Sequence, residues 1–175
     1  MIGLRDAGPP GRTDTDALRR VYGRFPTGVM AVCAMHDGDP AGFAASSFVV
    51  VSAEPPLVAV CVQRGSTTWP LVSASPSIGL SVLSAGQDRL CRQLAARGGF
   101  DRFIGAGWSA TAHGAVLIEE AAAWLECSVY QVSPAGDHEL ALMKVRRHGV
   151  DDDVAPLVFH ASGFRQLGAG YRPRS

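Results

Sequence analysis

Long apolar runs are missing from this sequence, and its N-terminal segment also lacks the apolar core of a signal peptide. A membrane-spanning helix needs about 20 consecutive apolar residues, so we expect no membrane span and a cytoplasmic protein. The sequence also has no net charge, because 16 basic residues balance 16 acidic ones. Without a positive balance, there is no electrostatic argument for nucleic acid or an anionic membrane as a partner.

The usual signatures of nucleotide and metal sites are missing as well. No Gly-x-Gly-x-x-Gly opens a helix after a strand, and no phosphate-loop lysine motif occurs, so a nicotinamide nucleotide would have to bind without a Rossmann domain. The histidines have no ligand spacing, and we expect no metal site. The cysteines lack the close spacing of a zinc or redox motif, so we expect structural thiols at Cys33, Cys61, Cys91 and Cys127.

What is present is the composition of one globular domain. Over 175 residues, 47% are apolar and 18% are charged, which suits a chain with a single hydrophobic core. We expect the domain to span residues 14–170. Residues 1–13, rich in glycine, proline and charge, are expected to form a flexible tail, and residues 171–175 a short C-terminal tail.

Most of the chain has the pattern of short strands separated by turns. We expect one helix from Asp14 and another capped by Ser84, with Gln87 at the capping-box spacing, whereas Phe100–Ala112 has no clear period and is expected to be a loop. The expected strands are Val29–Met35, Gly42–Ser52, Leu57–Val62, Ser77–Leu83, Val116–Glu120, Ala123–Val132, His138–Arg147, Pro156–His160 and Phe164–Leu167. This pattern predicts a mainly β protein, a barrel with peripheral helices.

A polar turn follows the valine-rich run Leu57–Val62 and leads into Trp69-Pro70, where the proline suits the first turn of a helix. The turn carries a cation and three hydroxyl side chains, at Arg64, Ser66, Thr67 and Thr68. Backbone N–H groups at a helix start, helped by hydroxyls and a cation, can hold a phosphate. A polar turn that only caps the helix explains the composition equally well.

Several short motifs follow one another in a recognisable order. They are FPTGV (Phe25–Val29), GFAASSF (Gly42–Phe48), EPPLVAVCV (Glu54–Val62), IGLSVLSAGQ (Ile78–Gln87), DRF (Asp101–Phe103), GDH (Gly136–His138) and PLVF (Pro156–Phe159). The series resembles the flavin reductase-like family, which consists of short-chain FMN-binding split-barrel NAD(P)H:flavin oxidoreductases, the reductase components of two-component flavin-dependent monooxygenases. The resemblance implies a Greek-key split β-barrel and a homodimer with flavin at the subunit boundary.

The resemblance also implies a set of flavin contacts. These are Ala45, Ser46, Ser47, Val62, Gln63, Arg64, Ser66, Thr67, Thr68, Ser81, Val82, Leu83, Gln87 and Phe103. Two positions depart from the family pattern: Ala44 stands where threonine is common, and Ser81 where asparagine is frequent, so the threonine hydroxyl and the asparagine amide are missing at these positions. Phe103 could stack on a flat ligand or cover an edge of the core.

The implied activity is hydride transfer from NADH or NADPH to FMN or FAD, and the implied partner is a monooxygenase that receives the reduced flavin. His138 is the implied catalytic residue, near the flavin and the nicotinamide, and His160 and Phe164 are implied contacts of the nicotinamide nucleotide. The sequence does not separate FMN from FAD, or NADH from NADPH. A 2′-phosphate needs a cation, and the candidates are Arg89, Arg92 and Arg102.

Two other functions remain open at this stage. The same barrel could bind flavin without turnover, as a sensor, carrier or storage protein, and the flavin contacts would then be identical. The nicotinamide side, with His138, is what distinguishes this alternative from the reductase. A split-barrel enzyme that uses a deazaflavin or haem is a third possibility, which the motif series favours less.

Overall fold

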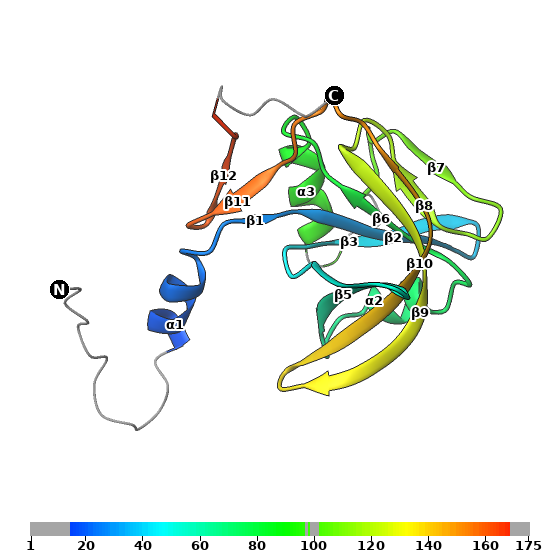
Figure 1. Ribbon diagram of the computed structural model, residues 1–175, viewed down its shortest axis with the longest axis horizontal. Coiled ribbons are helices and arrows are strands. Elements are labelled where there is room, and N and C mark those ends of the chain that lie inside the picture. The colour runs from blue at the N-terminus through cyan, green and yellow to red at the C-terminus, as the bar shows by residue number, and fades with distance from the viewer. Residues whose placement is uncertain (1–14, 97, 99–101, 169–175) are drawn as a thin grey trace.

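The computed structural model describes residues 15–96, 98 and 102–168, and the tails expected at residues 1–13 and 171–175 lie outside this part of the chain. Its main element is an antiparallel sheet of seven strands (Figure 1). In order across the sheet, the strands are β3 (Asp39–Ala45), β2 (Met30–His36), β6 (Ile78–Val82), β9 (Ala123–Ala135), β10 (His138–Val150), β5 (Pro56–Gln63) and β4 (Val49–Ala53).

The sheet closes on itself because its two edge strands are consecutive in the chain. β3 and β4 lie at opposite edges, yet only residues 46–48 join them. Laid flat, seven strands would be about 29 Å wide, whereas the link reaches about 14 Å at most. The sheet must therefore curl until its edges approach each other without pairing. This confirms the expected split barrel.

The order of the strands is that of a Greek key. After β5, the chain returns to place β6 beside β2, and the β9–β10 hairpin fills the gap between β6 and β5. The hairpin turns at Gly136-Asp137, where Gly136 has a φ of 66°, a conformation that glycine adopts without strain. The turn places His138 opposite Gln63 at the end of β5.

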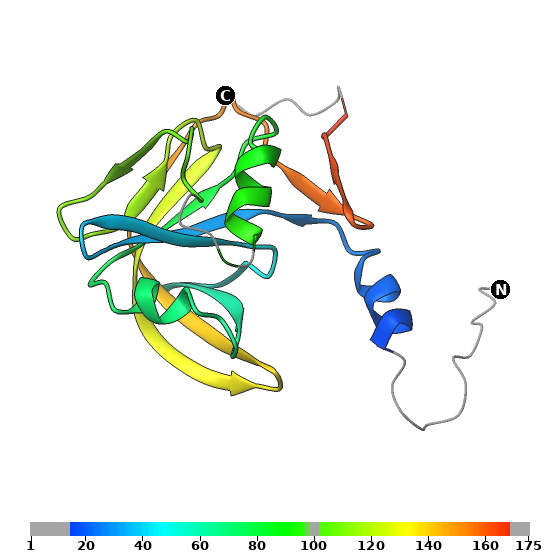
Figure 2. The same cartoon turned by 180° about the vertical axis from the view of Figure 1, so that it is seen from behind.

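Smaller elements flank the barrel, as Figures 1 and 2 show from opposite sides. The short strands are β1 (Thr27–Gly28), β11 (Val158–His160) and β12 (Gly163–Arg165) in one sheet, and β7 (Trp108–Ala110) and β8 (Val116–Ile118) in another. The helices are α1 (Thr15–Tyr22), α2 (Trp69–Ser73) and α3 (Asp88–Ala95). α3 packs on the barrel through buried Leu90, Cys91 and Leu94, whereas α1 buries no residue and stands away from the barrel.

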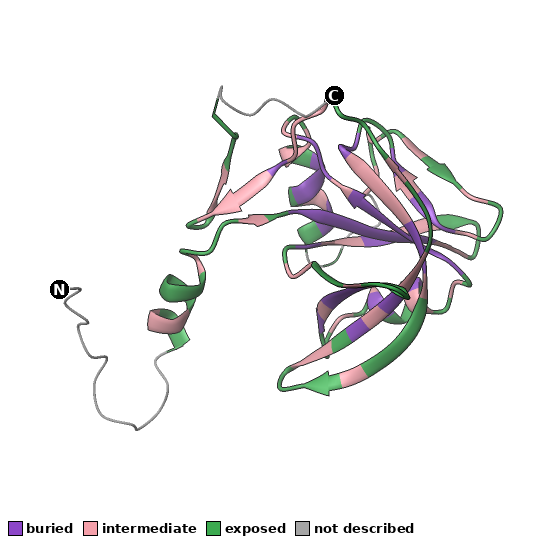
Figure 3. Cartoon of the chain, viewed as in Figure 1, coloured by how far each residue is buried: buried purple, intermediate pink, exposed green. Residues whose placement is uncertain are grey.

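The core consists of two clusters, and β2 contributes to both. Met30, Val32 and Ala34 belong to the cluster inside the barrel, whereas Ala31 and Cys33 belong to the cluster between the barrel and α3. This explains the unbroken apolar run in β2, because both of its faces are buried (Figure 3). In the described part of the chain, no helix is both long and apolar enough to cross a membrane.

Three expectations about local structure are wrong. The run Gly42–Ser52 is two strands, because the chain crosses between the sheet edges at residues 46–48. The helix expected from Ser84 begins only at Asp88, because the N–H of Gln87 donates to the carbonyl of Ser84 (2.9 Å) and closes a turn before it. The expected loop Phe100–Ala112 contains β7, which pairs with β8.

Candidate functional site

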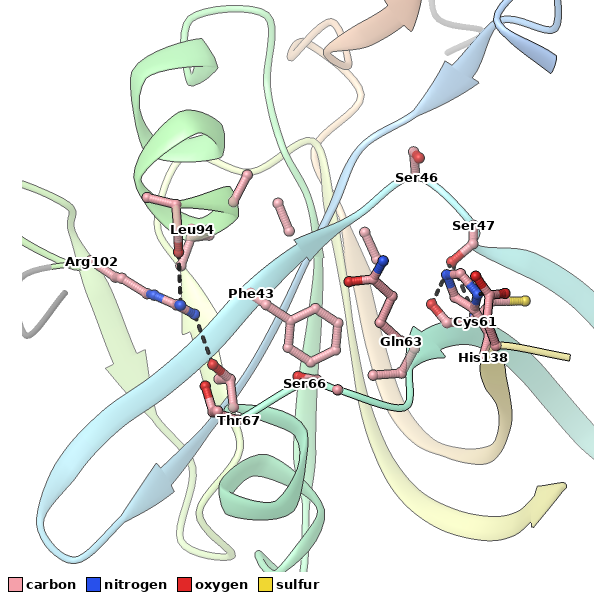
Figure 4. Close-up of a pocket in the computed structure, with 18 of the residues that line it drawn as sticks. Phe43, Ser46, Ser47, Cys61, Gln63, Ser66, Thr67, Leu94, Arg102 and His138 are labelled. Carbon is pink, nitrogen blue, oxygen red and sulfur yellow. Dashed lines mark hydrogen bonds and ion pairs between the residues drawn. The ribbon is translucent and has the colours of Figure 1, made fainter. Parts of the chain in front are cut away.

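A cavity of about 890 Å³ lies at the seam where β3 and β5 approach each other. β3 contributes Phe43, Ala44 and Ala45, and β5 contributes Cys61, Val62 and Gln63. Figure 4 shows the cavity lengthwise, with Arg102 and Thr67 at one end, Ser47 and His138 at the other, and Phe43 between them. The two ends differ in chemistry, so an elongated ligand would be held in one direction.

Ser47 bonds the link at residues 46–48 to β5. Its hydroxyl donates to the carbonyl of Cys61 and accepts from the N–H of the same residue, both at 3.0 Å. Ser47 comes from the link between the sheet edges, whereas Cys61 lies within β5. These bonds continue the β4–β5 register, in which Val49 pairs with Ala59, and they fix the link against β5 beside the cavity. The neighbouring side chains on this side of the cavity are small, so a flat group can approach the backbone closely. These residues are Ala44, Ala45 and Ser46.

The polar turn before α2 lines the opposite end of the cavity. The Ser66 hydroxyl accepts from the N–H of Trp69 (3.0 Å), and Pro70 has no N–H to offer. The first turn of α2 therefore differs from the anion site expected from the sequence, because one donor is already used and the next is absent. The hydroxyls that line this end besides Ser66 belong to Thr67 and Thr68.

Arg102 brings the positive charge to this end. Its guanidinium donates to the carbonyl of Gly42 (2.8 Å), the hydroxyl of Thr68 (2.9 Å) and the carbonyl of Ala96 (2.8 Å). These acceptors are uncharged, so the bonds orient the cation without neutralising it. A positioned guanidinium beside two threonine hydroxyls suits a phosphate. Arg64 is not among the described residues that line the cavity. Its backbone N–H donates to the carbonyl of Asp137 (3.1 Å).

His138 stands at the other end, as the first residue of β10 after the hairpin turn. Its Nδ1 lies 2.7 Å from an oxygen of Asp137, and both residues line the cavity. The hydrogen bond from His138, followed by the attraction of its positive charge, lowers the pKa of the Asp137 carboxyl below its usual value. Asp137 therefore holds the imidazole by Nδ1 and leaves Nε2 as the nitrogen for a ligand.

The structure brings together most of the predicted contacts, but not all of them. Those that line the cavity are Ala45, Ser46, Ser47, Val62, Gln63, Ser66, Thr67, Thr68 and His138. Of the others, Ser81 is buried with its hydroxyl accepting from the N–H of Ile118 (3.0 Å), and Gln87 donates to the carbonyl of Glu119 (2.7 Å). Val82 and Leu83 end β6 and follow it, away from the cavity lining.

The remaining predicted contacts are not among the described residues that line this cavity. His160 and Phe164 belong to β11 and β12, and the Phe164 ring packs 5.6 Å from that of Phe159 and 4.8 Å from the Arg92 guanidinium carbon. Phe103 packs on the backbone of Gly42, where an added Cβ would meet its ring at 3.0 Å, and it lines an adjoining cavity. The role of these three residues stays a prediction.

The residues present fit a flavin. A flavin mononucleotide has a phosphate at one end and a flat ring with polar edges at the other. Arg102 and the two threonines suit the phosphate, and the small residues of β3 leave room for the ring. Sequence reasoning missed Phe43, Leu94 and Asp137, and it considered Arg102 only for a 2′-phosphate.

Comparisons with known proteins agree with this geometry. A family model described as "Flavin reductase like domain" matches residues 22–168. A flavin reductase of Pseudomonas putida is 37% identical over 86% of this chain and 89% of its own. A flavin-dependent monooxygenase reductase subunit of Rhodococcus jostii is 33% identical over 84% of this chain and 75% of its own. The solved NADH:FAD oxidoreductase of Streptomyces globisporus, in complex with NAD and FAD fragments, superposes with a TM-score of 0.85 at 34% identity, covering 94% of this chain and 99% of that one.

Proposed function

This chain belongs to the flavin reductase-like family, and from that premise we propose that it is an NAD(P)H-dependent flavin reductase that supplies reduced FMN or FAD to a partner flavin-dependent monooxygenase. The observation that carries the proposal is the seam cavity, which has a cation and hydroxyls at one end and an anchored imidazole at the other. NADH is the expected donor, because the related solved structure from Streptomyces globisporus is an NADH:FAD oxidoreductase in complex with NAD and FAD fragments.

The chain's own residues bind and orient, and they need not exchange protons. Bound flavin supplies the redox chemistry, by accepting a hydride from the nicotinamide. Thr67, Thr68 and Arg102 hold the phosphate, and the small side chains of Ala45 and Ser46 leave room for the ring. His138, fixed through Nδ1 by Asp137, presents Nε2 to the ring edge or to the nicotinamide amide.

The test is NADH oxidation by the purified protein, followed by the loss of NADH absorbance with and without FMN, FAD and riboflavin. We expect flavin-stimulated oxidation. Flavin binding without oxidation of NADH or NADPH would instead identify a non-catalytic flavin-binding protein, and the reductase proposal would then be wrong.

Within the same assay, His138→Ala tests the assigned imidazole. We expect NADH oxidation to fall by at least about tenfold, because a positioned hydrogen-bond donor is lost, while flavin affinity stays nearly unchanged. His113→Ala is the matched control, since His113 is exposed in a turn away from the cavity. If His138→Ala behaves like the control in both measurements, the assignment fails.

We further propose that the protein works as a homodimer. The edge strand β4 exposes Val49, Val50 and Val51. In the β9–β10 hairpin, β9 exposes Tyr130 and Val132. An apolar edge strand of this kind is rarely left open in a monomer. A second copy of the chain, which carries the same face, would cover it.

Light scattering on the eluting protein checks this expectation. The wild type should elute with twice the 18.4 kDa mass of the chain. Val50→Asp should shift it toward the monomer, because Val50 is 71% exposed and a carboxylate at a buried interface is costly. Val150→Asp is the control, at a position that is 70% exposed near the opposite end of β10. A wild type that elutes as a monomer would contradict the proposal.

The thiols support the cytoplasm as the working compartment. All four cysteines are free. Burial raises the pKa of the Cys127 thiol to about 12, and burial also raises the pKa of Cys33 and of Cys91. Protonated, buried thiols are unreactive, as expected for structural cysteines in a reducing compartment.

A further inference from the structure

A second cavity, of about 830 Å³, adjoins the first. Thr67, Thr68 and Arg102 line both, so these residues form a shared wall between them. Resting on the proposed function, we propose that the second cavity receives the adenosine monophosphate half of FAD, and that the protein therefore prefers FAD to FMN.

The shared wall has the chemistry of a diphosphate site. The Arg102 guanidinium is oriented by bonds to Gly42, Thr68 and Ala96, and it lines both cavities. Of its five N–H groups, two on Nη1 and one on Nη2 are used by these bonds, which leaves one N–H on Nη2 and the Nε–H for phosphate oxygens. FMN would use one side of this wall only, whereas FAD carries a second phosphate to its other side.

The far end of the second cavity has the chemistry of a nucleoside. Asp37 and Asp39, on the β2–β3 hairpin, place carboxylates there, which accept hydrogen bonds from ribose hydroxyls. His36 lines the same cavity, and its Nε2 lies 3.4 Å from a carboxylate oxygen of Asp37. Leu71, Phe103 and Ile104 supply apolar surface. Leu71 and Ile104 are 38% and 56% exposed, unusual for such side chains inside a cavity, and a purine base would cover them.

An adenosine moiety could reach this cavity from FAD or from NADH, because both contain one. The shared wall favours FAD. Its residues are those that hold the flavin's own phosphate, so the next phosphate along the same molecule falls at the mouth of the second cavity.

The test is equilibrium dialysis of the whole protein against FAD, FMN and riboflavin, which requires no turnover. We expect FAD to bind about tenfold more tightly than FMN. Ile104→Ala and Asp39→Ala should each lower FAD affinity by about three- to tenfold and leave FMN affinity unchanged. The matched controls are Val150→Ala and Asp152→Ala, exposed residues outside both cavities, which should change neither affinity.

Two results would overturn the proposal. One is FMN binding as tightly as FAD in the wild type, or variants that weaken both flavins equally. The other is an Ile104→Ala variant whose FAD preference is intact but whose KM for NADH rises with FMN as acceptor, since the cavity would then hold the donor's adenosine. Selective FAD binding without NADH oxidation would defeat the reductase proposal and leave the assignment of the second cavity standing.

Discussion

Replacing Arg102 with alanine should weaken FMN binding by about one hundredfold while riboflavin affinity changes by less than about threefold. The guanidinium lines the cavity beside Thr67 and Thr68, and a hydrogen bond to a charged group contributes about 1.5–3 kcal/mol. Riboflavin has no phosphate, so it reports whether the rest of the cavity is intact. Isothermal titration calorimetry with each flavin gives both affinities.

The same arginine also holds parts of the chain together, so the measurement needs a structural control. Arg102 bonds carbonyls of Gly42 and Ala96, residues far from each other in sequence. Arg102→Lys keeps the positive charge but loses the planar set of guanidinium donors. Its affinity for FMN should therefore lie between that of the wild type and that of Arg102→Ala. Arg146→Ala, which removes an exposed arginine bonded to Ser128, should leave both affinities unchanged. Equal losses for FMN and riboflavin would mean that Arg102 supports the fold and does not bind the phosphate.

Gly79→Ala should destabilise the protein by about 3 kcal/mol or more, because the added methyl group has no space. An alanine Cβ at this position would lie 2.0 Å from the carbonyl oxygen of Val116 and 2.7 Å from its carbonyl carbon. Both contacts are to backbone, and Val116 is fully buried in the core between the barrel and α3. β6 and β8 would therefore have to separate, since no side chain can rotate aside.

Gly28→Ala is the matched control, with no atom within 4 Å of its added Cβ. We expect its free energy of unfolding to stay within about 1 kcal/mol of the wild type, and to rise if anything, because alanine restricts the unfolded chain. Urea unfolding followed by tryptophan fluorescence measures both variants. If the two substitutions shift the midpoint equally, the close approach of β6 to β8 is not what limits position 79.

The fold was predictable where local pattern and tertiary structure agree. The valines of β5, the apolar run of β2 and the turn at Gly136 each specify their own element, and so most strands were located. The division between β3 and β4 was not predictable in this way. No residue at 46–48 breaks a strand, and the chain separates there only because the curled sheet has two edges to join.

The site shows the same limit. The predicted flavin contacts that line the cavity lie within two short runs, Ala45–Ser47 and Val62–Thr68, which local sequence motifs mark. Arg102 comes from 60 residues beyond the Gly42 carbonyl that it bonds, and no local pattern records such a pairing. Arg64 is nearer in sequence, but it is not among the described residues that line the cavity, and its contact with the flavin stays a prediction.

The seam between β3 and β5 also bears on how long the protein lasts in a cell. The two strands are not paired there, whereas a flavin in the cavity would touch both. A ligand present at one hundred times its Kd stabilises the folded state by about 2.7 kcal/mol. The fraction of molecules that are open to proteases then falls by about one hundredfold. Flavin supply would then set the abundance of the enzyme as well as its rate, and copies without flavin would be degraded first.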